Sequence, residues 1–216
     1  MSEKRDTRNF DERRDDRTCQ TADNQDVGYV ETIRDNIILL LALEKRNLVK
    51  IEKMVGQQVV YDFLSENGIQ FDYYEHPEAP TIEIAAQYYR GEGTTLCKNL
   101  FFRNHKGNKH YLVILNSHYQ LDIHDLEKRL HQGKLSFASE QRMEKYLGVR
   151  PGSVSLFGLL NDKAHEVILF MDKTLLECQK VSFHPNDNRA SLVISMEDML
   201  KTIEICGNQV EFLELY

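Results

Sequence analysis

Apolar residues recur along the chain with two different spacings, and glycine and proline, at 11 and 4 residues, rarely interrupt them. Apolar residues spaced three and four apart, between capping residues, are typical of amphipathic helices. This spacing predicts helices at residues 57–67, 81–89, 122–131, 139–147 and 196–206. Short alternating or continuous apolar runs are typical of strands. They predict strands at residues 70–76, 97–103, 109–116, 166–172, 190–195 and 209–215.

The order of these elements predicts an α/β fold of the α+β type, in which helices flank a mixed sheet. The runs at 97–103 and 109–116 are joined by the glycine-containing segment "NHKGN", which favours an antiparallel hairpin. The other helices and strands are interspersed without regular βαβ alternation, so we do not expect a purely parallel sheet.

The first 56 residues differ from the rest of the chain. Residues 1–28 are polar and charged, which predicts a disordered tail. Residues 29–56 predict an N-terminal helical extension with a broad apolar stripe around Ile37 and Leu41. Such a stripe must be buried. Two interpretations stay open, namely docking on the domain formed by residues 57–216 and a homodimer contact.

Charge and cysteine content narrow the class of protein. The net charge of −7 excludes a global basic field, so any contact with RNA must use a local patch. The four cysteines show neither C-x-x-C nor zinc-finger spacing, which favours a reducing compartment. No signal peptide is evident, and the longest apolar run, Ile37–Leu43, is too short to span a bilayer. We therefore expect a cytoplasmic protein without membrane association.

Common catalytic signatures are missing from the sequence. It contains no Walker loop, G-x-G-x-x-G, H-E-x-x-H or G-x-S-x-G. The eight histidines are scattered, so neither a metal site nor a cofactor is expected. Cys97 lies beside Lys98, but neighbours on a strand point to opposite faces. We therefore expect Cys97 to be a buried, unreactive thiol.

Polar segments embedded in apolar structure are the candidates for chemistry. They are "CKNLFF" at 97–102, "GVRPGSVSLFGLLND" at 148–162 and "FHPNDN" at 183–188. Taken singly, each has an ordinary explanation: Lys98 as a strand-end charge, Gly152 as a turn glycine, and His184 as a satisfied histidine.

Taken together, these segments resemble a known family. With "YDFL…NGI" at 61–69, "EHPEAPT" at 75–81 and "LVIS" at 192–195, they follow the order seen in freestanding prolyl-tRNA editing proteins. These proteins are related to the YbaK proteins and to the editing insertion domain of bacterial prolyl-tRNA synthetase. The resemblance covers residues 57–216 and implies a curved mixed sheet surrounded by helices.

The resemblance also implies a function. Proteins of this kind are trans-editing aminoacyl-tRNA deacylases, which hydrolyse the ester of mischarged tRNA(Pro), most often Ala-tRNA(Pro). The implied partners are the acceptor end of this tRNA and, as a second partner, prolyl-tRNA synthetase. The family motifs map catalytic roles onto Lys98, Asn99, Gly152 and His184, and substrate-binding roles onto Ser153, Val154, Ser155, Leu156, Phe157 and Asp187.

The chemistry of these residues is compatible with ester hydrolysis, which needs a positioned water and stabilisation of a developing oxyanion. Backbone N–H groups near Gly152 are candidate donors, and Lys98 is a candidate for holding a phosphate or polarising the carbonyl. The general base stays open between His184, Asp187 and a hydroxyl of the substrate.

One residue departs from the family pattern. The loop that usually reads G-x-x-x-P is Gly152-Ser-Val-Ser-Leu156 here, and leucine constrains the backbone less than proline does. This departure, with the N-terminal extension, motivates an alternative function. In that alternative the protein is a catalytically silent tRNA- or synthetase-binding module.

Overall fold

The computed structural model describes residues 32–34, 36–42, 54–88 and 90–216. Contacts divide the chain into two units, Met1–Glu52 and Lys53–Tyr216. In the first unit, residues 32–34 and 36–42 are helical and their side chains are exposed. The predicted tail at 1–28 and residues 29–31, 35 and 43–53 of the predicted extension lie outside the described residues, and residues 54–56 form bends instead of the predicted helix. No helix in the described ranges is long and apolar enough to cross a membrane.

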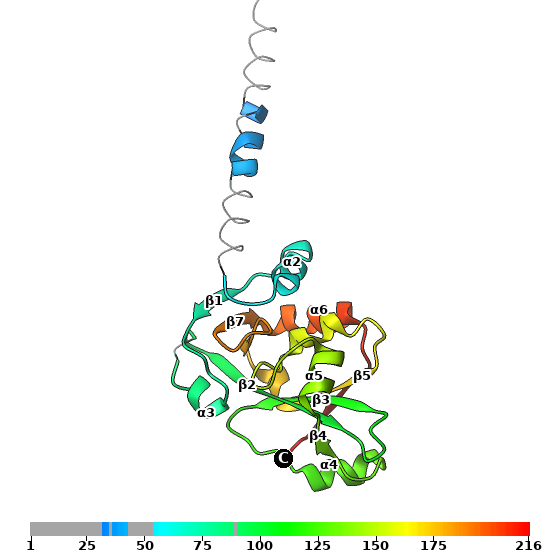
Figure 1. Ribbon diagram of the computed structural model, residues 1–216. Helices are drawn as coiled ribbons and strands as arrows, with labels where there is room; N and C mark the ends of the chain where they lie inside the picture. Colours follow the sequence, from blue (N-terminus) through cyan, green and yellow to red (C-terminus); the bar gives the residue numbers. More distant parts are fainter. Residues whose placement is uncertain (1–31, 35, 43–53, 89) are drawn as a thin grey trace, which may run out of the picture. The chain divides into compact units, whose positions relative to one another are not determined.

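The second unit is built on an eight-stranded mixed sheet in the order β1-β7-β6-β2-β3-β5-β8, with β4 paired to β2 (Figure 1). The strands are β1 (Asp72–Glu75), β2 (Thr94–Arg103), β3 (His110–Asn116), β4 (Ser136–Phe137), β5 (Val167–Asp172), β6 (Lys180–Phe183), β7 (Ala190–Ser195) and β8 (Val210–Leu213). The pairs β2–β6, β3–β5 and β5–β8 are parallel, and β1–β7, β2–β3, β2–β4 and β6–β7 are antiparallel. The predicted mixed α/β fold is confirmed.

The helices follow the predicted capping residues. They are α2 (Gln58–Glu66), α3 (Ile82–Ala85), α4 (Ile123–Leu130), α5 (Glu140–Leu147) and α6 (Met196–Cys206), with 3₁₀ helices η1 (Leu156–Asn161) and η2 (Lys173–Glu177). The Ser195 hydroxyl caps α6 by accepting from the Asp198 N–H, and it donates to the Asp198 carboxylate. Gly148 and Gly207 end α5 and α6 in the left-handed conformation.

Three local predictions needed correction. The helix predicted at 81–89 ends at Ala85, because residues 87 and 88 form tighter i→i+3 turns. Residues 150–162, for which neither helix nor strand was predicted, contain η1. The strand β6 was missed, because four residues next to a polar turn carry too little periodicity to identify.

Burial on both faces of the sheet explains the unbroken apolar sequence of β3. One face packs Phe102, Val113 and Leu115 with Leu126 of α4. The alternate residues on the other face, such as Leu112, are also fully buried. Strands covered on both faces read as continuous apolar runs rather than alternating ones. The hairpin β2–β3 therefore lies in the middle of the fold and gives the site a rigid floor.

Candidate functional site

A gap in the strand pairing of β2 defines the candidate site. Along one edge, β2 pairs continuously with β3, from Cys97 to Arg103. On its other edge, β2 pairs with β6 only over Thr94–Leu96 and with β4 only over Phe102–Arg103. The stretch between these partners includes the "KNL" residues 98–100. This edge of the sheet is therefore open at Lys98 and Asn99, and a cavity fills the opening.

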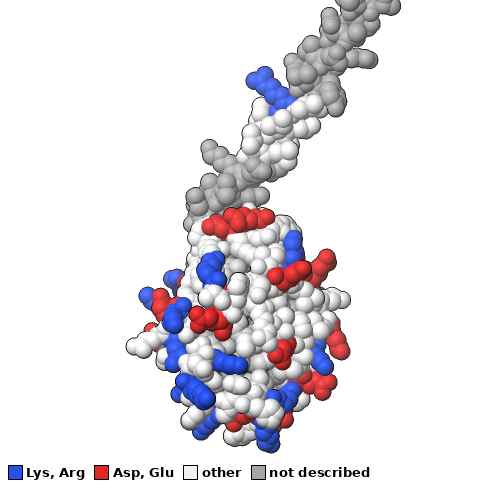
Figure 2. All heavy atoms as spheres, turned by 90° about the vertical axis from the view of Figure 1, so that its right-hand side faces the viewer, with Lys and Arg blue, Asp and Glu red and all other residues white. Residues whose placement is uncertain are grey.

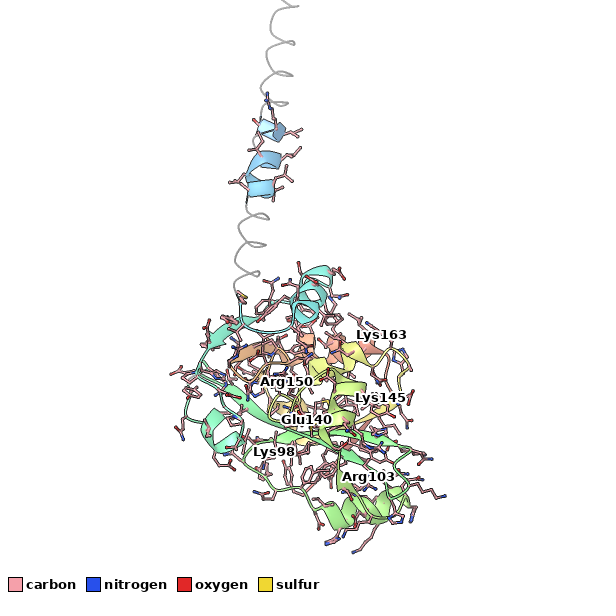
Figure 3. The ribbon with its side chains drawn as sticks, in the orientation of Figure 1. Lys98, Arg103, Glu140, Lys145, Arg150 and Lys163 are labelled. Atoms are coloured by element: carbon pink, nitrogen blue, oxygen red, sulfur yellow. The ribbon has the colours of Figure 1, made fainter. Side chains whose placement is uncertain are left out.

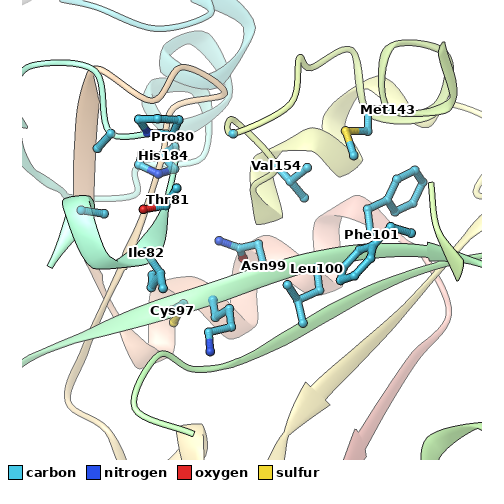
Figure 4. Close-up of a pocket in the computed structure, with 15 residues that line it drawn as sticks. Pro80, Thr81, Ile82, Cys97, Asn99, Leu100, Phe101, Met143, Val154 and His184 are labelled. Carbon is cyan, nitrogen blue, oxygen red and sulfur yellow. The ribbon is translucent and has the colours of Figure 1, made fainter. Parts of the chain in front are cut away.

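The β2 cavity, as we call it, has a volume of about 290 Å³ and is lined by residues from several separate segments (Figure 4). Its walls come from the start of α3, from β2, β4 and α5, and from the loops at 152–154 and 184. The lining residues are Ala79, Pro80, Thr81, Ile82, Ala85, Cys97, Lys98, Asn99, Leu100, Phe101, Phe137, Met143, Gly152, Val154 and His184. The lining is mostly apolar with a few polar groups, as is usual for small-ligand sites.

Asn99 presents its amide to the cavity between the Thr81 and Val154 walls (Figure 4). Its Oδ1 is buried and has no hydrogen-bond partner among the described residues. Buried side-chain amide oxygens are normally satisfied, so this unpaired acceptor is unusual, and the Nδ2 beside it makes no hydrogen bond among the described residues and is free to donate to a ligand. The Asn99 amide is the most direct sign of a binding function in this cavity.

Lys98 leaves β2 on the face opposite Asn99, since consecutive residues of a strand alternate in direction. Its Nζ donates to the Tyr119 carbonyl oxygen at 3.0 Å, in an exposed position. Figure 3 labels Lys98 on β2 and Arg150 on the loop that follows α5. The ammonium of Lys98 is thus held at the rim, although the side chain also lines the cavity.

His184 brings an imidazole whose tautomer is fixed by its neighbours. Its Nδ1 lies 2.9 Å from the Ala190 carbonyl oxygen, which only accepts, so Nδ1 carries the proton and Nε2 carries the lone pair. Burial lowers the pKa of His184, and the nearby His76 and Arg90 act in the same direction. The ring is therefore neutral near pH 7 and has one nitrogen available to accept a proton.

A network behind His184 was not identified from the sequence. The His76 ring lies edge-on to His184 with centroids 6.2 Å apart, and its Nδ1 donates to the Pro77 carbonyl at 2.8 Å. Its Nε2 must then accept from the Ser191 hydroxyl, at 3.0 Å. Arg90 Nε donates to the same hydroxyl oxygen at 2.9 Å. The motif "EHPEAPT" was the only sequence signal for this network.

Gly152 sits at the third position of a turn over residues 150–153. The Ser153 N–H donates to the Arg150 carbonyl at 3.0 Å, with proline at position 151 and a φ of +83° at Gly152. This arrangement is a type II turn, which needs glycine at its third residue. A Cβ on Gly152 would lie 3.2 Å from Pro80 Cα, so the turn packs closely on the opposite wall. The Val154 N–H makes no hydrogen bond within the described part of the chain.

The remaining predicted substrate-binding residues lie outside the β2 cavity. Ser155 donates its hydroxyl to the His184 carbonyl at 2.6 Å, and it also caps η1. Leu156 and Phe157 are fully buried in the core. Ser153 and Asp187 line a different, polar hollow on the other side of the turn.

The Asp187 carboxylate is already occupied. It accepts from Arg189 Nε at 2.9 Å and from Arg189 Nη2 at 2.6 Å, and these hydrogen bonds lower its pKa. Between the two candidate bases, His184 lines the cavity and has a free nitrogen, whereas Asp187 has neither property.

Cys97 is buried in the cavity wall, and burial raises the pKa of its thiol, as expected for an unreactive cysteine. Among the described residues, no group of His, Cys, Asp or Glu side chains is arranged to hold a metal ion.

The family of aminoacyl-tRNA editing domains matches this chain over residues 76–202. The chain belongs to the aminoacyl-tRNA editing domain family. It is 40% identical over 162 residues to the prolyl-tRNA editing protein ProX of Acetoanaerobium sticklandii, which covers 75% of this chain and 99% of that protein. It is 33% identical to the prolyl-tRNA synthetase associated domain-containing protein 1 of Mus musculus, covering 65% of this chain and 85% of that protein.

A solved structure has the same fold. It is described as a putative trans-editing enzyme for prolyl tRNA synthetase and aligns with a TM-score of 0.56 and 24% identity, covering 72% of this chain and 94% of that one. Lys98, Asn99, Gly152 and His184 all lie within the part of the chain that matches the editing domain family. The family membership expected from the motifs is therefore confirmed.

Proposed function

We propose that this protein hydrolyses the ester bond of mischarged tRNA(Pro), with Ala-tRNA(Pro) as its main substrate. The observation that carries the proposal is the β2 cavity. It collects Asn99, Gly152 and His184 from distant segments in a chain of the editing family. The similarity to ProX over nearly the full length of that protein supports the same assignment.

The size of the cavity supports a small aminoacyl group. A volume of about 290 Å³ is at the lower end of the range for ligand sites. Ile82, Met143 and Val154 provide apolar walls for a methyl side chain. Apolar walls discriminate only modestly between side chains that differ by one methylene, so a panel of substrates is needed to define the preference.

His184 is our candidate general base. A water molecule attacks the ester carbonyl carbon and transfers a proton to the free Nε2 of His184, whose low pKa keeps it unprotonated near neutrality. The bond between the carbonyl carbon and the ribose oxygen then breaks, and the ribose oxygen takes the proton back from His184. The products are the free amino acid and uncharged tRNA.

The developing oxyanion needs donors at the cavity wall. The Asn99 Nδ2 group and the Val154 N–H are donors there that make no hydrogen bond among the described residues. Lys98 is tethered at the rim by the Tyr119 carbonyl, which favours binding of a substrate phosphate over polarising the carbonyl.

The position of Leu156 argues against the alternative of a silent binding module. Leu156 is the first residue of η1, where a side chain is buried in the core and does not line the β2 cavity. Proline suits the first position of a helix because its fixed φ fits there and no N–H is needed. Leucine therefore replaces the family proline without removing any group from the site.

Partners and compartment complete the proposal. Lys, Arg, Asp and Glu side chains are interspersed on the face in Figure 2, which favours local recognition of the tRNA acceptor end. Prolyl-tRNA synthetase and a second copy of this chain are further proposed partners. The exposed apolar side chains at Ile33, Ile37 and Leu41 support such an association. The unpaired Cys97, Cys178 and Cys206 favour the cytoplasm.

Deacylation assays test the function directly. We expect the protein to hydrolyse Ala-tRNA(Pro) faster than cysteinyl-, seryl- or prolyl-tRNA(Pro), and we expect Lys98→Ala and Asn99→Ala to be slower than wild type. An unaltered rate in Lys98→Ala would remove its assigned role. If wild type binds these tRNAs without hydrolysing any of them, the protein is a binding module.

Sedimentation of the full chain, compared with that of a chain starting at Gln57, tests whether the N-terminal extension forms a homodimer. Equal monomeric masses would exclude the dimer.

A further inference from the structure

A second hollow lies directly beside the β2 cavity. It has a volume of about 500 Å³, and we call it the Arg90 hollow. The residues that matter for its chemistry are Gln87, Arg90, Thr94, Asn116, Ser117 and His118. The hollow and the cavity share two elements: Leu96 and Cys97 are consecutive on β2, and Ala85 and Ala86 are consecutive at the end of α3 (Figure 1). The hollow therefore lies next to the cavity along β2, within reach of a chain whose end occupies the cavity.

The described residues that line the Arg90 hollow are neutral or basic. The chain carries 34 acidic and 27 basic residues, yet no Asp or Glu lines this hollow in the part that the structure describes. The polar hollow on the far side of the Gly152 turn, by contrast, contains Glu78, Glu144 and Asp187. Hydroxyl, amide and imidazole groups at the Arg90 hollow offer hydrogen-bond donors without any repelling carboxylate.

Arg90 places a positive charge at the hollow without a negative partner. The residue is only 6% exposed, and its Nη1 donates to the Ala85 and Tyr88 carbonyls at 2.5 and 2.6 Å. Its Nη2 is buried and has no acceptor among the described residues. Burial lowers the pKa of Arg90, and no neighbouring carboxylate opposes this effect. A buried cation without a counter-charge is unfavourable unless a ligand supplies one.

We propose that the Arg90 hollow binds a backbone phosphodiester of the single-stranded RNA end whose terminal aminoacyl ester enters the β2 cavity. The ester is carried by the last nucleotide, so the phosphodiester that precedes this nucleotide lies next to the ester site. The guanidinium of Arg90 attracts the phosphate through its charge, which acts strongly in surroundings of low dielectric constant. Ser117, His118 and Gln87 provide donors at the surface. The inference rests on the proposed deacylase function.

The experiment places a carboxylate in the hollow without disturbing Arg90. Gln87→Glu is nearly isosteric at an exposed position, and Ser117→Asp adds a carboxylate at a half-buried position. The exposed Gln141 on α5 lines none of the three hollows, so Gln141→Glu is the matched control. Binding of a CCA RNA trinucleotide that carries no amino acid is measured by fluorescence anisotropy at several salt concentrations. We expect both hollow variants to bind about tenfold more weakly than wild type.

The salt dependence and a phosphate-free substrate sharpen the test. Losing one phosphate contact should reduce the slope of log affinity against log salt by about 0.7. The KM for Ala-tRNA(Pro) should rise in Gln87→Glu, whereas hydrolysis of alanyl-adenosine, which has no phosphate, should be unchanged. Equal trinucleotide affinities of Gln87→Glu and Gln141→Glu would overturn the proposed phosphate site. If wild type hydrolyses no ester, the deacylase proposal fails, and the trinucleotide comparison still decides whether the hollow binds phosphate.

Discussion

Two histidines in this fold, the fully buried His110 and the half-buried His184, have pKa values shifted in the same direction but differ in their contacts. Burial lowers the pKa of both His110 and His184. His110 on β3 is only 1% exposed, its Nε2 accepts from Arg142 Nη1 at 2.6 Å, and its ring packs against Tyr146 with centroids 3.9 Å apart. The accepting nitrogen of His110 is therefore occupied, and the residue lines none of the cavities described above.

His184 has the same neutral imidazole in a different setting. A carbonyl oxygen occupies its Nδ1, while the side chain lines the β2 cavity beside Asn99 and Gly152. The difference shows that a lowered pKa reports burial and does not identify a site by itself. The features that distinguish a candidate catalytic histidine are a free accepting nitrogen and an open space next to it.

The largest expected effect separates these two histidines. His184→Gln removes the proposed general base and should lower kcat/KM for Ala-tRNA(Pro) by about 10²- to 10⁴-fold. His110→Gln keeps an acceptor for Arg142 and should leave kcat/KM of the folded protein within about twofold of wild type. Deacylation rates and circular dichroism of both variants make the comparison. A similar loss of activity in both variants would show that the distinction drawn from their contacts is wrong.

The next effect contrasts two glycines, one beside each histidine. Gly152 and Gly107 have φ values of +83° and +71°, so alanine is strained by about 1–2 kcal/mol at either position. The added Cβ would meet the Pro80 backbone at Gly152, but only the flexible end of the Arg142 side chain at Gly107. Gly152→Ala should lower the deacylation rate about tenfold, because a shift of the Gly152 turn by about 1 Å would move the cavity wall out of its productive geometry.

Gly107→Ala provides the control for this contrast. It should lose comparable stability in urea unfolding and keep its activity. Equal activities of the two variants would mean that the Gly152 turn does not shape the site.

The helices and strands of the fold could be predicted from the sequence more fully than the geometry of the site. Strong periodicity and capping residues, such as Ser195 before α6, predicted most helices and the β2–β3 hairpin. The short strand β6 carried no comparable signal. Its absence from the prediction hid the gap in β2 pairing between β6 and β4, which is where the cavity forms.

The candidate residues were predictable only through the family motifs. Periodicity cannot show that Lys98 donates to the Tyr119 carbonyl, or that Asp187 is held by Arg189. Nor can it show that His76, Ser191 and Arg90 form one network, since these residues come from three separate segments. Such contacts depend on tertiary packing, and no local pattern in a single sequence encodes them.

The third prediction concerns stability against pH and again uses His110. Burial, with Arg142 and Lys145 nearby, lowers its pKa to about 4 in the folded state, against an ordinary value of about 6.5 in the unfolded chain. Between these values the unfolded chain binds more protons, so the free energy of unfolding falls as the pH drops from about 6.5 to about 4. His76 and His184 act in the same direction.

His110→Gln should therefore make the loss of stability on acidification smaller. Urea midpoints of wild type and variant at pH 7.5 and pH 5 provide the measurement. Because His76 and His184 remain, we expect a reduced pH dependence rather than none. Identical losses of stability between the two pH values would show that His110 takes up its proton equally in the folded and unfolded chain.

The smallest expected effect is at Leu156, where the chain departs from its family. Leu156→Pro restores the family residue at the first position of η1, after the extended Ser155 that caps it. Proline has its preferred φ there, and an extended preceding residue suits it. Both stability and deacylation should change little, with kcat/KM within about twofold and unfolding free energy within about 1 kcal/mol. A large gain in activity would mean that this loop, rather than the free nitrogen of His184, limits the site.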